Sequence, residues 1–131
     1  MITISKNILD SIVDHAKSEL PNEACGYLGG KDGIITRSYP LTNIDHSPEH
    51  FSFDPAEQFA TIKRARIDDV AILANYHSHP ASPARPSVED IRLAYDPNIL
   101  YFIISLAENN PTIKAFRIVN GDVSNEELII K

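Results

Sequence analysis

The sequence predicts an α/β protein of the α+β type, a single domain over residues 1–131 in which a mixed β-sheet is flanked by helices. Two continuous apolar runs, residues 70–77 and 100–106, are typical of strands inside a sheet that is covered on both faces. Helical patterns occupy other parts of the chain, and turn signals such as Asn120-Gly121 predict antiparallel neighbours. These three observations together favour the mixed sheet.

The chain opens with a helix predicted over residues 5–20. Its apolar side chains recur on one helical face, and Pro21 ends it. A hairpin is predicted next, in which the apolar segment 24–30 leads through a turn at residues 31–33 into a second strand at residues 34–39. The apolar face of the helix consists of Ile8, Leu9, Ile12, Val13, Ala16 and Leu20.

A loop over residues 40–48 and a short alternating strand at residues 51–53 lead to a second predicted helix. Asp54 is the expected N-cap of this helix, and Pro55 suits its first position because that position needs no N–H donor. The helix is expected to end near Asp68. The side chains expected to face inward are Phe59, Ile62 and Ala65.

The second half of the chain adds one helix and three strands. After the first central strand, three prolines between residues 80 and 86 exclude regular structure until a third helix opens at Ser87. The second central strand follows at residues 100–106. Turns then separate a strand at residues 112–119 from a last strand that ends near Ile130.

Composition excludes several classes of function. A net charge of −6 argues against a general nucleic-acid binder and against adsorption to an anionic membrane, since both need a basic surface. The single cysteine cannot form an internal disulfide or a multi-cysteine zinc site. The N-terminus lacks the apolar stretch of a signal peptide, and residues 99–106 are too few to cross a bilayer, so we expect a cytoplasmic protein.

The strongest functional signal is a set of candidate metal ligands. His77 and His79 are two residues apart on a predicted strand, so both side chains point to one face at its C-terminal end. The proline-rich loop then returns the chain to Asp90, in the first turn of the third helix. Two imidazoles and a carboxylate leave one tetrahedral position open for water, as a catalytic zinc ion requires. Ser78 is expected to point away, toward the core or the neighbouring backbone.

Each member of this set also has a simpler interpretation. Ser87 and Asp90 form an N-cap with an acidic third helical position, which needs no metal, although such a cap would also hold Asp90 rigidly as a ligand. Glu23 alone reads as a solvated side chain. Because it leads directly into a strand expected to border the site, it is our candidate for the base of a metal-dependent peptidase.

Four other features carry less weight. Residues 46–50 match the His-x-x-Glu-His zinc-protease pattern, but Pro48 interrupts the helix that this pattern needs. Cys25 is expected to be a small buried residue rather than a nucleophile. His15 is expected to be half-buried on the first helix. Arg85 contacts either substrate or solvent, and the sequence does not distinguish the two.

At this point the motifs PNEACGYLGG and NYHSHPASPARPSVED resemble the JAMM (MPN+) metallopeptidase family, whose signature is a Glu, then His-x-His-Pro, then Ser-x-x-Asp. The compact length is similar to that of the stand-alone prokaryotic branch. The resemblance implies a curved β-sheet flanked by helices, related to the cytidine deaminases. It also implies one Zn²⁺ with a bound water, held by His77, His79 and Asp90. Deamination itself is excluded, because the deaminase Pro-Cys-x-x-Cys ligands are missing.

The resemblance further implies a reaction and a partner. Glu23 would act as the acid–base residue and Ser87 as the donor to the oxyanion, in hydrolysis after the C-terminal Gly-Gly of a ubiquitin-like or sulfur-carrier protein. A narrow slot would select glycine, and the strand after Glu23 is a candidate edge for pairing with the tail. Two alternatives stay open: a metallohydrolase of small peptides, and a non-catalytic binding module in which the metal only stabilises the loop.

Overall fold

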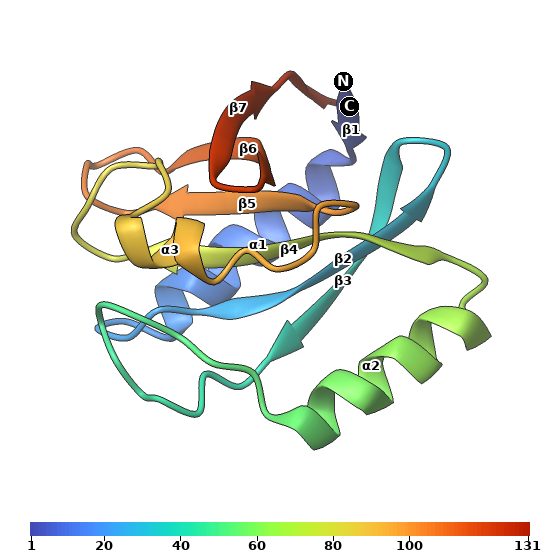
Figure 1. Cartoon of the computed structure of the whole chain (residues 1–131), viewed down its shortest axis with the longest axis horizontal. Helices are drawn as coiled ribbons and strands as arrows, with labels where there is room; N and C mark the ends of the chain where they lie inside the picture. Colours follow the sequence, from blue (N-terminus) through green and yellow to red (C-terminus); the bar gives the residue numbers. More distant parts are fainter.

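The computed structural model describes all residues, Met1–Lys131, and contains one eight-stranded mixed sheet with three helices (Figure 1). The strand order is β7-β6-β5-β4-β2-β3-β1-β8. The helices are α1 (Lys6–Ser18), α2 (Pro55–Ile67) and α3 (Val88–Arg92). The strands are β1 (Ile2–Ile4), β2 (Cys25–Lys31), β3 (Ile34–Leu41), β4 (Ala71–His79), β5 (Leu100–Ser105), β6 (Thr112–Val119), β7 (Asp122–Glu126) and β8 (Leu128–Ile130).

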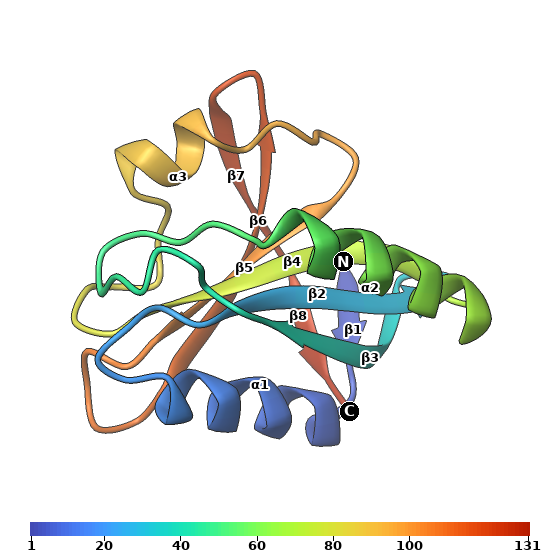
Figure 2. The same ribbon diagram turned by 90° about the horizontal axis from the view of Figure 1, so that it is seen from below.

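The helices divide between the two faces of the sheet (Figure 2). Helix α1 covers one face, where Leu9, Ile12 and Ala16 join a cluster of 14 buried apolar residues. Helices α2 and α3 lie on the other face, where α2 contacts β3 and β4 and Ile91 of α3 packs against β5 and β6. The predicted mixed sheet is confirmed, since β4 pairs with β5 in parallel and with β2 in antiparallel orientation.

The three predicted helices begin where their capping residues indicate. The Ser5 side chain accepts a hydrogen bond from the Ile8 N–H at the start of α1, and Asp54 accepts one from the Ala56 N–H at the start of α2. Ser87 caps α3. Each cap satisfies an N–H group that the first helical turn leaves without a partner.

The predicted inner face of α2 is wrong in two of its three residues. Ala65 is buried, but Phe59 is 62% exposed and Ile62 is 39% exposed. The helix buries only a narrow stripe, Thr61 and Ala65. The exposed Phe59 ring lies under the Lys63 ammonium, 4.8 Å from its centroid, so the cation covers part of its surface.

The strands also depart from the prediction in places. Phe53 forms only an isolated bridge with Asn43, so residues 51–53 are not a strand of the sheet. Strand β1 is too short, at three residues, to give a periodic signal, yet it pairs with both β3 and β8. The single last strand of the prediction is two strands, β7 and β8.

Strand β2 is an interior strand, which corrects the expectation that it offers an edge to a substrate. It is hydrogen-bonded to β3 on one side and to β4 on the other. Its glycines serve close packing within the fold: a Cβ at Gly26 would lie 2.4 Å from the Tyr76 ring and 2.5 Å from the Tyr39 carbonyl oxygen. A substrate tail therefore has no free backbone to pair with on β2.

Candidate metal centre

The C-terminal end of β4 carries His77 and His79 into one site on the face opposite α1. Both are almost fully buried, at 3% and 4% exposure. Ser78 between them points away, as expected, and its Oγ accepts a hydrogen bond of 2.8 Å from the Ala24 N–H. The Ser78 N–H donates to the Ala24 carbonyl in return. This pair of bonds fixes the backbone that follows Glu23 against the backbone of the two histidines.

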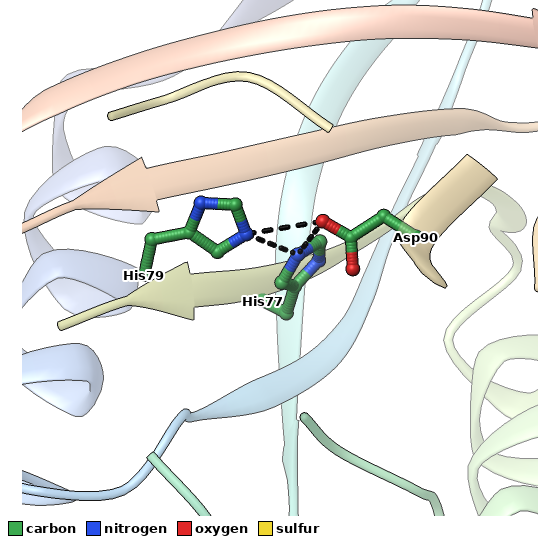
Figure 3. Close-up of side chains that lie close together, drawn as sticks. All are labelled: His77, His79 and Asp90. Carbon is green, nitrogen blue, oxygen red and sulfur yellow. Dashed lines mark hydrogen bonds and ion pairs between the residues drawn. The ribbon is translucent and has the colours of Figure 1, made fainter. Parts of the chain in front are cut away.

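The three predicted ligands converge, and their donor atoms form a small triangle (Figure 3). The two Nε2 atoms lie 3.1 Å apart. Asp90 Oδ2 lies 3.2 Å from His77 Nε2 and 3.1 Å from His79 Nε2. A tetrahedral zinc ion with bonds of about 2.0–2.1 Å separates its ligand atoms by about 3.3 Å. The triangle is therefore close to the size that such an ion requires.

The hydrogen bonds of His79 prepare one of its nitrogens for a metal. Its Nδ1–H donates to the Pro83 carbonyl oxygen at 2.8 Å, which leaves a lone pair on the Nε2 that faces the triangle. Burial alone would lower the pKa of His79, but its contacts with Asp90 and the Pro83 carbonyl raise it. The donor set fits a small divalent cation such as Zn²⁺, because it combines two imidazole nitrogens with one carboxylate oxygen.

Asp90 is positioned by the capping box at the start of α3. Its Oδ2 accepts a hydrogen bond of 2.9 Å from the Ser87 N–H, and its own N–H donates to Ser87 Oγ at 3.0 Å. Burial alone would raise the pKa of Asp90, but the contacts with His77 and His79 outweigh it and keep the pKa far below its usual range. Asp90 is thus both a member of the capping box of α3 and a candidate metal ligand.

Ser87, the predicted oxyanion donor, uses its hydroxyl oxygen to accept from the Asp90 N–H. A hydroxyl has one proton to donate besides its accepting lone pairs, so the cap leaves the Ser87 proton free. The side chain is at the surface of the loop, within reach of solvent and ligands. This geometry is compatible with a donor role.

Glu23, the predicted base, is buried, at 4% exposure, just before β2. Its Oε1 has no hydrogen-bond partner. Burial raises the pKa of this carboxyl to about 8, while the charge of His79 opposes the shift and the charges of Asp90 and Glu89 add to it. A divalent cation on the triangle would lower this pKa, because it would place two positive charges near the carboxylate.

Two residues that contact the site are not predicted by the sequence, and both belong to the loop over residues 42–53. The Phe51 ring stacks on His77 with centroids 4.7 Å apart. The buried Asn43 donates its Nδ2–H atoms to the carbonyls of Glu23 and His50. Asn43 therefore ties the backbone of Glu23 to the loop that covers His77. The Phe-Ser-Phe alternation marks these aromatics in the sequence, but it is equally typical of a strand.

A cleft of about 720 Å³ opens beside the metal triangle. His77 and Asp90 line it at one end, and its floor crosses β2, β4, β5 and β6. Aromatic and aliphatic side chains form most of its wall, including Tyr27, Phe53 and Tyr101. A mostly apolar cleft with a few converging polar groups is the usual form of a binding site.

The weaker sequence candidates lie outside the metal triangle. Residues 46–50 form an irregular loop without a shared helix face, which confirms that the His-x-x-Glu-His match is accidental. Cys25 is fully buried, and burial raises the pKa of its thiol to about 12, so a nucleophilic thiolate is strongly disfavoured. His15 is half-buried as expected and contacts Tyr76. Arg85 is exposed and is not among the residues that line the cleft.

Fold and site together define a class of protein: a small α+β domain with two histidines and one aspartate placed to hold one metal ion beside a buried glutamate. The chain belongs to the family described as prokaryotic homologs of the JAB domain, whose model matches residues 5–119. The predicted JAMM/MPN resemblance and the curved sheet flanked by helices are thereby confirmed. No helix of the structure is long and apolar enough to span a membrane.

Three known proteins illustrate the similarity. The CysO-cysteine peptidase of Mycobacterium tuberculosis is 33% identical over 129 residues, which cover 96% of this chain and 88% of that protein. A protein of Desulfitobacterium hafniense, whose structure was solved in solution, is 52% identical and superposes with a TM-score of 0.93. The match covers 100% of this chain and 93% of that protein. A structure described as JAMM, a metalloprotease-like zinc site in the proteasome and signalosome, shares the fold with a TM-score of 0.66 at 22% identity, covering 100% and 98% of the two chains.

Proposed function

We propose that this protein is a zinc-dependent peptidase or isopeptidase that hydrolyses the bond after the C-terminal Gly-Gly of a ubiquitin-like or sulfur-carrier protein. The observation that carries the proposal is the triangle of His77, His79 and Asp90 donor atoms, with edges of 3.1–3.2 Å, at the end of an open cleft. The similarity to a relative named as a peptidase supports hydrolysis as the class of reaction.

The proposed roles follow from the position of each side chain. His77, His79 and Asp90 would hold the ion, which when bound makes a water more acidic and polarises a carbonyl group. Glu23 would take a proton from the attacking water and deliver it to the leaving amine. Its position suits this task, because burial raises its pKa above that of an exposed carboxyl and the nearby cation would lower it again, so that the group could both accept and release a proton.

Ser87 would stabilise the negative charge that develops on the carbonyl oxygen of the substrate. Its free hydroxyl proton is available to donate, because the N-cap bond uses only an oxygen lone pair. The capping box also links this donor to the ligand Asp90 through two hydrogen bonds. The proposed donor and the residue that would hold the metal are thereby fixed relative to each other.

The experiment is a cleavage assay followed by intact mass. Zinc-loaded protein is mixed with a sulfur-carrier protein that is extended by several residues beyond its Gly-Gly end, and Glu23→Gln serves as the matched control. We expect the wild type to remove the extension at the glycine and Glu23→Gln to leave it in place. An intact extension after incubation with zinc-loaded wild type, across several carriers, would reject the proposed function in favour of a small-peptide hydrolase or a binding module.

A further inference from the structure

One polar side chain in the floor of the cleft has no role in the proposed reaction so far. Asn75 lies on β4 two residues before His77, and both line the cleft. Its Oδ1 is buried and has no hydrogen-bond partner. An unpaired buried amide oxygen costs about 1–3 kcal/mol, so a residue with this property at a cleft calls for an explanation.

The neighbours of Asn75 in the sheet are aromatic. In the register of the sheet it pairs with Tyr27 on β2 and with Tyr101 on β5, and both tyrosines line the same cleft. Their hydroxyl groups are engaged elsewhere: Tyr27 accepts from Gln58, and Tyr101 donates to the Asp96 carbonyl. The Asn75 amide therefore lies between two aromatic side chains. Neither of them makes a hydrogen bond to its oxygen.

A primary amide has the same donor and acceptor groups as a peptide bond, so the two can pair through two hydrogen bonds. We propose that Asn75 is a substrate-binding residue, whose terminal amide turns its oxygen toward the cleft and pairs with a main-chain peptide group of the Gly-Gly tail that lies there. The inference rests on the proposed function and adds the residue that would read the main chain of the tail.

The spacing along β4 indicates which peptide group this is. Asn75 and His77 are two residues apart on one face, about 6.6 Å along the strand. An extended tail advances by the same amount in two residues. If the carbonyl of the last glycine lies at the metal triangle beside His77, the N–H of the first glycine of the pair lies near Asn75. A glycine there lets the main chain lie low against the floor, since it has no side chain between them.

The experiment compares two substrates and two variants of the full-length, zinc-loaded protein. One substrate is a carrier tail with an extension after Gly-Gly, and the other carries N-methylglycine in place of the first glycine, which removes the N–H. We expect Asn75→Leu to lower kcat/KM for the ordinary tail about 5- to 50-fold, as for a lost hydrogen bond. We expect N-methylation to impair the wild type by a similar factor and to change the rate of Asn75→Leu by less than about 2-fold.

Stability separates this role from a purely structural one. Asn75→Leu removes an unpaired polar group, so its Tm is expected to equal or exceed that of the wild type. The matched variant is Asn43→Leu, because the amide of Asn43 makes hydrogen bonds through both its oxygen and its nitrogen. We expect Asn43→Leu to lower the Tm clearly.

Each outcome has a distinct meaning. Unchanged kcat/KM in Asn75→Leu, or an equal N-methylation penalty in wild type and variant, would overturn the inference while leaving the proposed function intact. A loss of Tm in Asn75→Leu as large as in Asn43→Leu would make the amide structural and would also overturn it. If the wild type cleaves neither tail, the proposed function fails and the inference fails with it.

Discussion

The two faces of the sheet differ in whether their buried polar side chains have hydrogen-bond partners. On the α1 face, the buried Tyr76 hydroxyl is paired with His15 Nδ1 at 2.7 Å within a continuous apolar core. On the cleft side, three buried side-chain atoms have no hydrogen-bond partner: Glu23 Oε1, Asn75 Oδ1 and His77 Nδ1. No atom of the α1 face belongs to this group of three.

The difference indicates that one face is built for stability and the other for chemistry. Unpaired buried groups lower the free energy of unfolding, and in native proteins such groups commonly mark a ligand, an ion or a bound water. On the cleft face, the Ser78–Ala24 bonds fix the backbone after Glu23 to β4, and Asn43 ties the Glu23 carbonyl to the loop over His77. This face therefore holds reactive groups in fixed positions that the α1 face stabilises from behind.

The largest expected effect is a loss of bound metal and activity with the hydrophobic core unchanged. Asp90→Ala removes one corner of the triangle, so the protein should lose both its bound metal and its activity. Glu89→Ala, the next acidic residue on α3, should keep the metal, because Glu89 is not part of the triangle. Metal content after dialysis and turnover on the extended carrier measure both variants. Retained metal in Asp90→Ala would show that the ligand set is wrong.

The second effect is the converse, a change to the α1 face. Phe102 is fully buried in the core on that side, and Phe102→Ala should reduce the free energy of unfolding by about 3–5 kcal/mol. The folded fraction should still bind metal with normal affinity, because no atom of Phe102 belongs to the triangle. Urea unfolding and a metal titration at low temperature check the two statements. Coupled losses would mean that the faces are not independent.

The third effect tests the residue that joins a structural role to a chemical one. Ser87→Ala removes both the cap of α3 and the proposed oxyanion donor, so turnover should fall by about 10²–10³, with a loss of stability of about 1 kcal/mol. Ser5→Ala removes the equivalent serine cap of α1 and provides the control. It should lose similar stability while turnover per folded molecule is unchanged. If both variants reduce turnover by the same small factor, Ser87 is a cap only.

The sequence predicts the site better than it predicts the fold around it. His77, His79 and Asp90 could be found because a strand fixes the direction of residues two apart and a capping box fixes the start of a helix. Phe51 and Asn43 could not, because their contacts with His77 and Glu23 join segments distant in the chain. The exposure of Phe59 and the interior position of β2 depend in the same way on which elements become neighbours.

The smallest expected effect concerns Glu23 in the metal-free protein. Its pKa is raised to about 8 by burial, so between pH 4.5 and 8 the folded state binds more protons than the unfolded state. The stability that this carboxyl contributes is complete below about pH 4.5 and is lost as the pH rises through 8. One pKa unit corresponds to about 1.4 kcal/mol, so the wild type should lose at least that much relative to Glu23→Gln between pH 5 and pH 9.

Urea unfolding of both metal-free proteins across this range measures the effect, and added zinc should reduce it, since a nearby cation stabilises the carboxylate. Parallel pH profiles for wild type and Glu23→Gln would mean that the Glu23 carboxyl is solvated. The α1 face, with its buried polar groups paired, and the cleft face, with unpaired ones, would then differ only at Asn75 and His77.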